Sequence, residues 1–159
     1  MRTGTNLTYI ITRFAVDLVL PAFFNIRVTG KENIPKKGGG LFCANHLSYL
    51  DPVVIGYCTS RAVCYMAKSE LFSLRVFGKF ISDLHAFPVN RKGSGKDALR
   101  KSISLIREGN LVLMFAEGTR GTEDKLGEIK SGGPFVASKA GAPIIPVYIS
   151  GSGRLWPRD

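Results

Sequence analysis

Side chains that could move a proton are concentrated in residues 45–52, Asn-His-Leu-Ser-Tyr-Leu-Asp-Pro. His46 is a candidate general base, because an unperturbed imidazole has a pKa near neutrality. A carboxylate bonded to one ring nitrogen would fix the tautomer and leave the other nitrogen able to accept a proton. Asp51 lies five residues further on, and on one regular helix the two side chains would diverge by about 140°. We therefore expect His46 in a turn and Asp51 in the first turn of the next helix.

The same tract also has a purely structural interpretation. Asp51-Pro52 is a common pair at the start of a helix, and Ser48-x-x-Asp51 matches a capping box. Taken alone, the tract fits helix initiation as well as it fits proton transfer.

Two further polar tracts each follow an apolar run. The first is Glu117-Gly118-Thr119-Arg120, which combines an acid, a glycine, a hydroxyl and an arginine. Such a turn offers hydroxyl recognition and a bidentate contact to phosphate, although an isolated turn of this composition is usually an ordinary polar loop. The second tract is Phe87-Pro88-Val89-Asn90-Arg91, which places an arginine at the end of another predicted strand.

The elements that must position these tracts alternate between short strands and helices. Apolar runs predict strands at 41–44, 62–67, 86–89, 111–115 and 144–149, with 26–29 as one more candidate. Helical spacing predicts helices at 69–82 and 96–108. This alternation predicts an α/β fold with a largely parallel central sheet flanked by helices, and such sheets have their active sites at strand ends. Pro143 and Pro146 suit a strand at the sheet edge.

The first segment, residues 1–25, predicts an apolar membrane-associating helix. Asn6, Arg13 and Asp17 fall within an arc of about 40° on a helical wheel, and the rest of the surface is mostly apolar. A spanning helix is disfavoured, because a charge near its centre costs about 2.5–3.5 kcal/mol. A helix lying in the membrane interface fits both features. A core helix packed on its own domain remains an alternative. Residues 26–159 form the second, larger unit.

Composition limits the possible partners. The net charge of +10 favours anionic partners such as lipid, nucleic acid or phosphorylated small molecules. No nucleic-acid module is recognisable, so we expect no nucleic-acid partner. Three cysteines without CxxC spacing and two histidines do not assemble a metal site, and we expect buried free thiols in a reducing compartment. A Gly-x-Ser-x-Gly elbow and a Walker loop are both lacking.

Taken together and in this order, the tracts resemble those of the glycerolipid acyltransferase family, which includes 1-acylglycerol-3-phosphate acyltransferases. The resemblance runs from about residue 26 to residue 156. His46 and Asp51 match the family's His-x4-Asp motif, 87–91 its second block, 117–120 its Glu-Gly-Thr-Arg block and 143–147 its fourth. The chain departs from the family at Ala116, usually proline, and at His85, where a glycine is common before Ala86. We expect His85 to be a surface or hydrogen-bonded histidine rather than a second base.

The resemblance implies transfer of a fatty acyl group from acyl-CoA or acyl-carrier protein to a lysophosphatidate-like acceptor. His46 would deprotonate the acceptor hydroxyl and Asp51 would orient His46, while Lys130 is a further candidate for the phosphate. The residues expected to hold the phosphorylated acceptor are Arg91, Glu117, Gly118, Thr119 and Arg120. No cofactor or metal is implied beyond the thioester co-substrate.

The expected location is the cytoplasmic face of the cell membrane, with anionic lipid as a partner. Other acceptors, namely glycerol-3-phosphate, another lysophospholipid or a lipid A precursor, fit the same residues. A membrane-binding relative without turnover is the non-catalytic alternative. Family members continue for several dozen residues beyond a segment like 150–152, so the chain is expected to be a fragment or a minimal member that lacks the family's C-terminal part.

Overall fold

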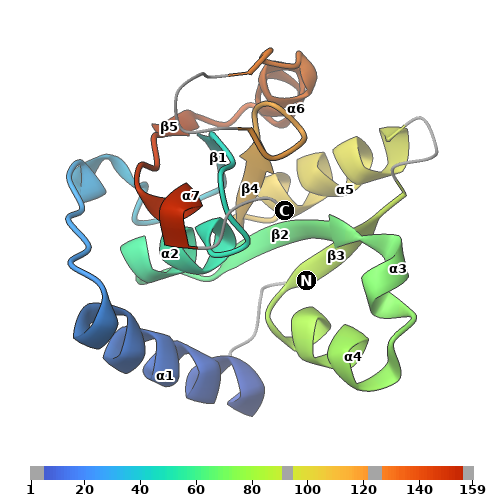
Figure 1. Cartoon of the computed structure of the whole chain (residues 1–159). Helices are drawn as coiled ribbons and strands as arrows, with labels where there is room; N and C mark the ends of the chain where they lie inside the picture. Colours follow the sequence, from blue (N-terminus) through green and yellow to red (C-terminus); the bar gives the residue numbers. More distant parts are fainter. Residues whose placement is uncertain (1–5, 91–94, 122–126, 156–159) are drawn as a thin grey trace.

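Five parallel strands form one central sheet in the computed structural model, which describes residues 6–90, 95–121 and 127–155 (Figure 1). The strands are β1 (Gly40–Ala44), β2 (Val63–Lys68), β3 (Ala86–Val89), β4 (Leu111–Phe115) and β5 (Ile144–Val147). Their order in the sheet is β3-β2-β4-β1-β5, and every pairing between them is parallel. The largely parallel sheet predicted from the sequence is therefore confirmed.

Helices cover both faces of this sheet. They are α1 (Leu7–Phe23), α2 (Asp51–Cys58), α3 (Ser69–Phe72), α4 (Arg75–Asp83), α5 (Lys96–Arg107), α6 (Gly132–Ala140) and α7 (Ser152–Leu155), with a 3-10 turn at Lys31–Asn33. Leu41 and Phe42 are neighbours on β1, so their side chains point to opposite faces. Leu41 belongs to an apolar cluster with Ile106 of α5 and Val136 of α6, whereas Phe42 belongs to a cluster with Ile55 of α2.

The connections after β1 and β4 diverge between these two faces. β1 is followed by α2 on one face, and β4, its neighbour in the sheet, is followed by α6 on the other face. The chain therefore separates at the carboxyl ends of two adjacent parallel strands. In open α/β sheets this switch point is where ligands bind.

Most predicted elements are present, and the differences have local causes. Residues 26–29 form no strand, and α6, which opens with Gly-Gly-Pro, has no prediction to match it. The single helix predicted at 69–82 is wrong, because the backbone at Leu74 is extended and separates α3 from α4. Gly78 makes the resulting turn possible, since a Cβ there would lie 2.6 Å from the carbonyl oxygen of Phe72. The predicted edge position of the Pro143–Val147 tract is confirmed by β5, an outer strand of the sheet.

Asn6 and Arg13, two of the three residues of the polar stripe of α1, face the domain, whereas Asp17 is exposed. The Arg13 guanidinium donates to the carbonyl oxygens of Gly56 and Thr59 at the end of α2. Asn6 and Thr8 donate to Asp83 at the end of α4. The core-helix alternative is therefore met only in part: α1 packs on its own domain, but mainly through polar contacts.

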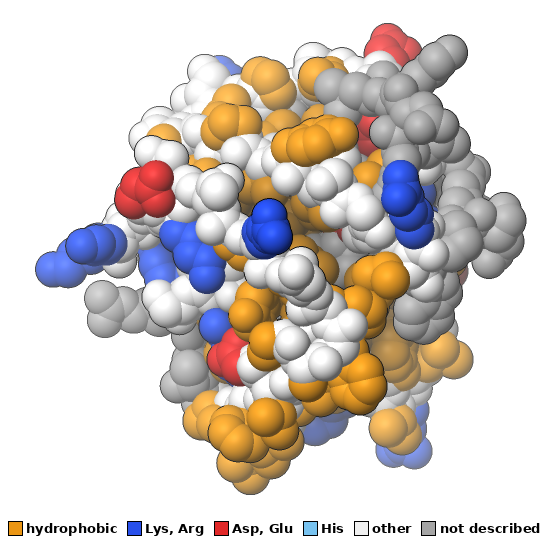
Figure 2. Space-filling model, turned by 60° about the vertical axis from the view of Figure 1, so that its left-hand side comes forward, with side chains coloured by type: hydrophobic (Ala, Val, Ile, Leu, Met, Phe, Trp, Pro, Cys, Tyr) orange, Lys and Arg blue, Asp and Glu red, His pale blue; other side chains and the backbone are white. Residues whose placement is uncertain are grey.

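The apolar face of α1 is left outside. Leu7, Phe14 and Phe23 are 71%, 71% and 77% exposed, and Leu20 is the only buried residue of this helix. Figure 2 shows hydrophobic side chains gathered over the lower part of the molecule, the level at which α1 lies in Figure 1. No helix in the described part of the chain is both long and apolar enough to span a membrane.

Candidate active site

His46 and Asp51 form a hydrogen-bonded pair at the carboxyl end of β1. His46 lies in the loop after this strand and Asp51 is the first residue of α2, as the spacing predicts. The Nδ1 atom of His46 lies 2.8 Å from Oδ2 of Asp51. The Asp51 side chain is fully buried, whereas that of His46 is 14% exposed. When Nδ1 donates to the carboxylate, Nε2 carries the lone pair that can accept a proton.

The Asp51 carboxylate is held on both oxygens. Oδ2 also accepts the backbone N–H groups of Leu47 and Ser48 at 2.6 and 2.8 Å, and Oδ1 accepts the Ser152 hydroxyl at 2.6 Å. Burial acts to raise the pKa of Asp51, but hydrogen bonds from His46, Ser152, Ser48 and Leu47 outweigh burial and lower this pKa. The carboxylate is therefore ionised at neutral pH. The helix-initiating and the His-orienting interpretations of this tract both hold, because one carboxylate does both.

The imidazole of His46 is also fixed by packing. Its ring stacks on Phe115, the last residue of β4, with centroids 3.7 Å apart and planes inclined by 9°. Its neighbour Asn45 exchanges two hydrogen bonds with the backbone of Ile149, at 2.7 and 2.8 Å. The ring orientation is thus determined by three chain segments.

Glu117 joins the two loops of the site. Its side chain is buried, and its oxygens accept backbone N–H groups from His46 at 3.3 Å and from Gly127 at 2.6 Å. The backbone N–H of Gly121 donates to the backbone carbonyl of His46 at 2.8 Å. Glu117 thus has a structural role that the sequence analysis missed. Contact with the acceptor stays a prediction.

Two cations border the same loop. The Arg120 guanidinium stacks 3.7 Å above the ring of Tyr49 and donates to its hydroxyl at 2.9 Å. Gly118 has a φ of +71°, and a Cβ there would lie 3.0 Å from Nζ of Lys130, so this ammonium lies directly over the glycine. Thr119 is exposed between Gly118 and Arg120. The structure therefore brings the 117–120 tract and Lys130 beside His46, whereas Arg91 lies outside the described residues.

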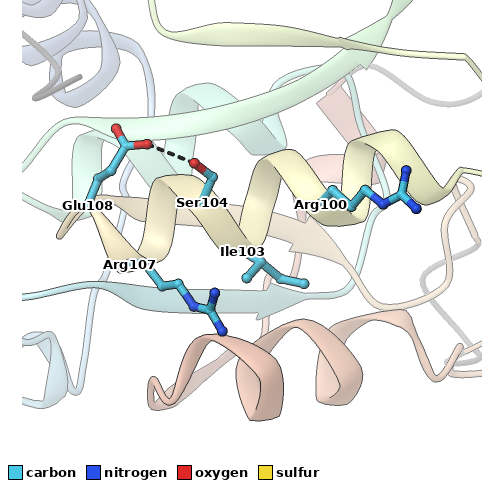
Figure 3. Close-up of a pocket in the computed structure, with 5 residues that line it drawn as sticks. All are labelled: Arg100, Ile103, Ser104, Arg107 and Glu108. Carbon is cyan, nitrogen blue, oxygen red and sulfur yellow. Dashed lines mark hydrogen bonds between the residues drawn. The ribbon is translucent and has the colours of Figure 1, made fainter.

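Other groups lie apart from this site. A surface cavity of about 420 Å³ runs along α5, lined by Arg100, Ile103, Ser104, Arg107 and Glu108, and shares no residue with the His46 site (Figure 3). Within the described ranges no cluster of three or more His, Cys, Asp or Glu side chains could hold a metal ion. All three cysteines are free thiols, and burial raises the pKa of Cys64 to about 11.

His85 differs from its expected surroundings. It adopts a φ of +66°, its ring lies 5.0 Å from that of Tyr9, and burial lowers its pKa. His85 is half-buried, and its buried Nε2 has no hydrogen-bond partner among the described residues, so the expected hydrogen bonding is not found at this atom. The left-handed backbone explains why a glycine suits this position.

Ser152, from beyond β5, is a positioning residue that the sequence analysis did not identify. We expect Ser152→Ala to lower turnover roughly tenfold, because one charge-assisted hydrogen bond to Asp51 is lost. A lowered pKa contributes stability above the unfolded value of about 4, and this contribution disappears as pH falls below it. In Ser152→Ala the loss should be smaller and should be complete at a higher pH, because the folded-state pKa of Asp51 then lies closer to the unfolded value; the readout is unfolding free energy against pH. Ser150→Ala, at an exposed serine of the same segment, is the matched control; identical pH dependence in both variants would contradict this role.

Glu117 and Arg120 should respond differently to substitution. Glu117→Ala should reduce the unfolding free energy by about 1–3 kcal/mol, because two backbone N–H groups lose their acceptor.

Arg120→Ala should leave thermal unfolding nearly unchanged and raise the KM for a phosphorylated acceptor more than the KM for the donor. Arg100→Ala, at an exposed arginine on α5, controls for lost charge. Equal rises in both KM values for Arg120→Ala would exclude recognition of the acceptor phosphate by this side chain.

Comparison with known proteins gives a consistent result. The acyltransferase family profile matches residues 25–150. A 1-acyl-sn-glycerol-3-phosphate acyltransferase of Bacillus subtilis is 33% identical over 86% of this chain and 68% of the relative, and one of Borreliella burgdorferi is 32% identical over 97% and 63%. The chloroplastic LPAT1 of Arabidopsis thaliana is 27% identical over 94% of this chain, which spans 42% of that relative.

The solved structures extend this similarity to three dimensions. The crystal structure of the 1-acyl-sn-glycerophosphate acyltransferase PlsC from Thermotoga maritima matches with a TM-score of 0.77 and 28% identity, covering 92% of this chain and 61% of that one. Its likeness extends across the parallel sheet and the helices on both faces. The profile match over most of the sequence and the identity to the Bacillus relative show that this chain belongs to the acyltransferase family.

Proposed function

We propose that the protein transfers a fatty acyl group from an acyl thioester to the free hydroxyl of 1-acylglycerol-3-phosphate. The observation that carries this proposal is the hydrogen-bonded His46–Asp51 pair beside the cations of Arg120 and Lys130. A base and a phosphate-binding surface at one switch point suit an acceptor that carries both a hydroxyl and a phosphate. The similar proteins of Bacillus and Borreliella are named for this acceptor class.

The reaction follows from the orientation of His46. Its Nε2 takes the proton of the acceptor hydroxyl while the oxygen attacks the thioester carbonyl. The resulting imidazolium is stabilised by the ionised Asp51 through Nδ1–H. The tetrahedral intermediate then collapses, the C–S bond breaks, and the departing thiolate receives the proton from Nε2. The products are an ester and a free thiol, and His46 returns to its neutral form.

The donor in this proposal is acyl-CoA or acyl-carrier protein, with no further cofactor. The dyad requires only a carbonyl activated by a thiol leaving group, so both donors fit the same chemistry. Arg91 remains a proposed acceptor contact together with Glu117, Gly118, Thr119 and Arg120.

We also propose that the protein works on the anionic cytoplasmic face of the cell membrane. The outward apolar face of α1 and the net charge of +10 both support this location. A helix that uses its polar stripe for its own domain leaves its apolar face for the interfacial region of a bilayer. Cations then add attraction to anionic headgroups.

Activity is tested by thiol release from palmitoyl-CoA, with lysophosphatidate presented in anionic vesicles. We expect acceptor-dependent release, and His46→Ala should reduce it by roughly 10²–10⁴-fold or more, because the general base is gone. The matched control is His85→Asn at the only other histidine, where asparagine tolerates the positive φ. Wild-type turnover in His46→Ala would exclude the mechanism. Vesicle binding without release from any thioester donor would favour the non-catalytic alternative.

Membrane binding is tested on exposed side chains of α1 that do not serve the core. The double variant Phe14→Ser, Leu18→Ser should weaken sedimentation with anionic vesicles by tenfold or more, since burying each side chain contributes about 1.5–3 kcal/mol. Phe135→Ser, at an exposed position on α6, should change binding little. Unchanged sedimentation of the double variant would argue against α1 as a lipid contact.

A further inference from the structure

α4 carries a second outward apolar face. Val76, Phe77 and Phe80 lie within about 100° on the helical wheel, and all three are exposed, Val76 by 85%. The opposite side of the helix holds buried Gly78, where a Cβ would collide with the backbone of Phe72. The apolar side chains of α4 therefore point away from the domain, although a soluble protein normally turns such a face inward.

Two cations lie along one side of this apolar face. Arg75 is exposed at the first turn, and Lys79 is 77% exposed while its Nζ contacts the Asp83 carboxylate at 3.2 Å. An apolar face with cations along one side is complementary to the interfacial region of an anionic bilayer. Together with the net charge of +10, these cations favour an anionic lipid surface as the partner of this face.

α1 and α4 lie next to each other on one side of the molecule. Asn6 and Thr8, at the start of α1, donate to Asp83, at the end of α4, at 2.8 and 3.1 Å. Tyr9 also contacts His85 just after α4. Figure 1 shows the two helices along the lower part of the molecule, on the side of the sheet away from α5 and α6. A bilayer that contacts one of them is therefore close to the other.

We infer that α4 is a second lipid contact, with Val76 and Phe77 entering the interfacial region of an anionic membrane beside α1. This inference rests on the membrane location proposed above and extends it to a surface far from the N-terminus in sequence. α3 begins directly after β2, at the carboxyl ends of the strands, and His46 lies at the same end of the sheet. Two contacts instead of one fix how this edge faces the membrane, because a single helix leaves rotation about its axis free.

The direct test uses one tryptophan at a time. In a Trp156→Phe background, which removes the only native tryptophan, Val76→Trp reports on α4, Phe14→Trp on α1 and Phe135→Trp on α6 at the other face of the sheet. Each variant is mixed with phosphatidylglycerol–phosphatidylcholine vesicles carrying brominated acyl chains, and with unbrominated vesicles. We expect bromine to quench emission from Val76→Trp and Phe14→Trp, and to leave Phe135→Trp unchanged.

The other outcomes separate the two proposals. Quenching of Phe14→Trp but not of Val76→Trp would overturn the α4 contact and leave the α1 contact standing. Quenching of none would overturn both contacts, whereas acyl transfer would still be tested by thiol release. Equal quenching of all three would show insertion without a preferred face and would also overturn the inference.

Binding strength gives a second readout. The double variant Val76→Ser, Phe77→Ser should weaken vesicle binding roughly tenfold or more, and Arg75→Gln should weaken it about fivefold at low salt. The double variant Ile129→Ser, Phe135→Ser removes exposed apolar side chains elsewhere and should bind as the wild type does. Thermal unfolding checks that each variant is folded. Wild-type binding by a folded Val76→Ser, Phe77→Ser variant would overturn the α4 contact.

Discussion

The buried Asp51 carboxylate is the constraint on which the rest of the site depends. An ionised group removed from water is costly unless charge-assisted hydrogen bonds replace its hydration. Here the imidazole, two backbone N–H groups and the Ser152 hydroxyl supply them. These donors come from the loop after β1 and from the segment after β5, which are separated by about a hundred residues in sequence. Both segments must be in place for Asp51 to be ionised and for His46 to hold one tautomer.

The sheet provides this convergence. β1 lies between β4 and β5, so the loop bearing His46 has a neighbour on each side. The β4 side contributes Phe115, which stacks on the ring, and Glu117, which bonds its backbone. The β5 side contributes Ile149, which anchors Asn45. Since the helices after β1 and β4 leave on opposite faces, the space above His46 is not covered by either crossover. The topology thus holds the His46 loop between two neighbouring strand ends that fix its ring and its backbone.

Local pattern was enough to predict the five strands of the sheet, with 26–29 as one wrong addition, and the meeting of His46 with Asp51, because both depend on residues close in sequence. The helix break at Leu74 was not predicted, because the apolar spacing continues through it. The turn is evident only from the close approach of Gly78 to Phe72. The α6 helix was not predicted, because Gly-Gly-Pro has a low helix propensity. Packing of this helix on α5 and β1 outweighs that propensity. Ser152 and the inward carboxylate of Glu117 required tertiary structure, since a serine and an acid in polar loops carry no local signal of their partners.

α2 links the catalytic pair to the surface proposed to meet lipid. Its N-terminal residue is Asp51, and the carbonyl oxygens of Gly56 and Thr59 at its C-terminal end accept hydrogen bonds from Arg13 of α1. A helix of eight residues is about 12 Å long, so one short rigid element connects α1 to the carboxylate that orients His46. The polar stripe of α1 therefore has a structural role, because its Arg13 caps the C-terminal end of α2. With the polar side directed at the domain, the apolar face of α1 points outward. The same contacts that complete the domain thus determine which side of it is available to a membrane.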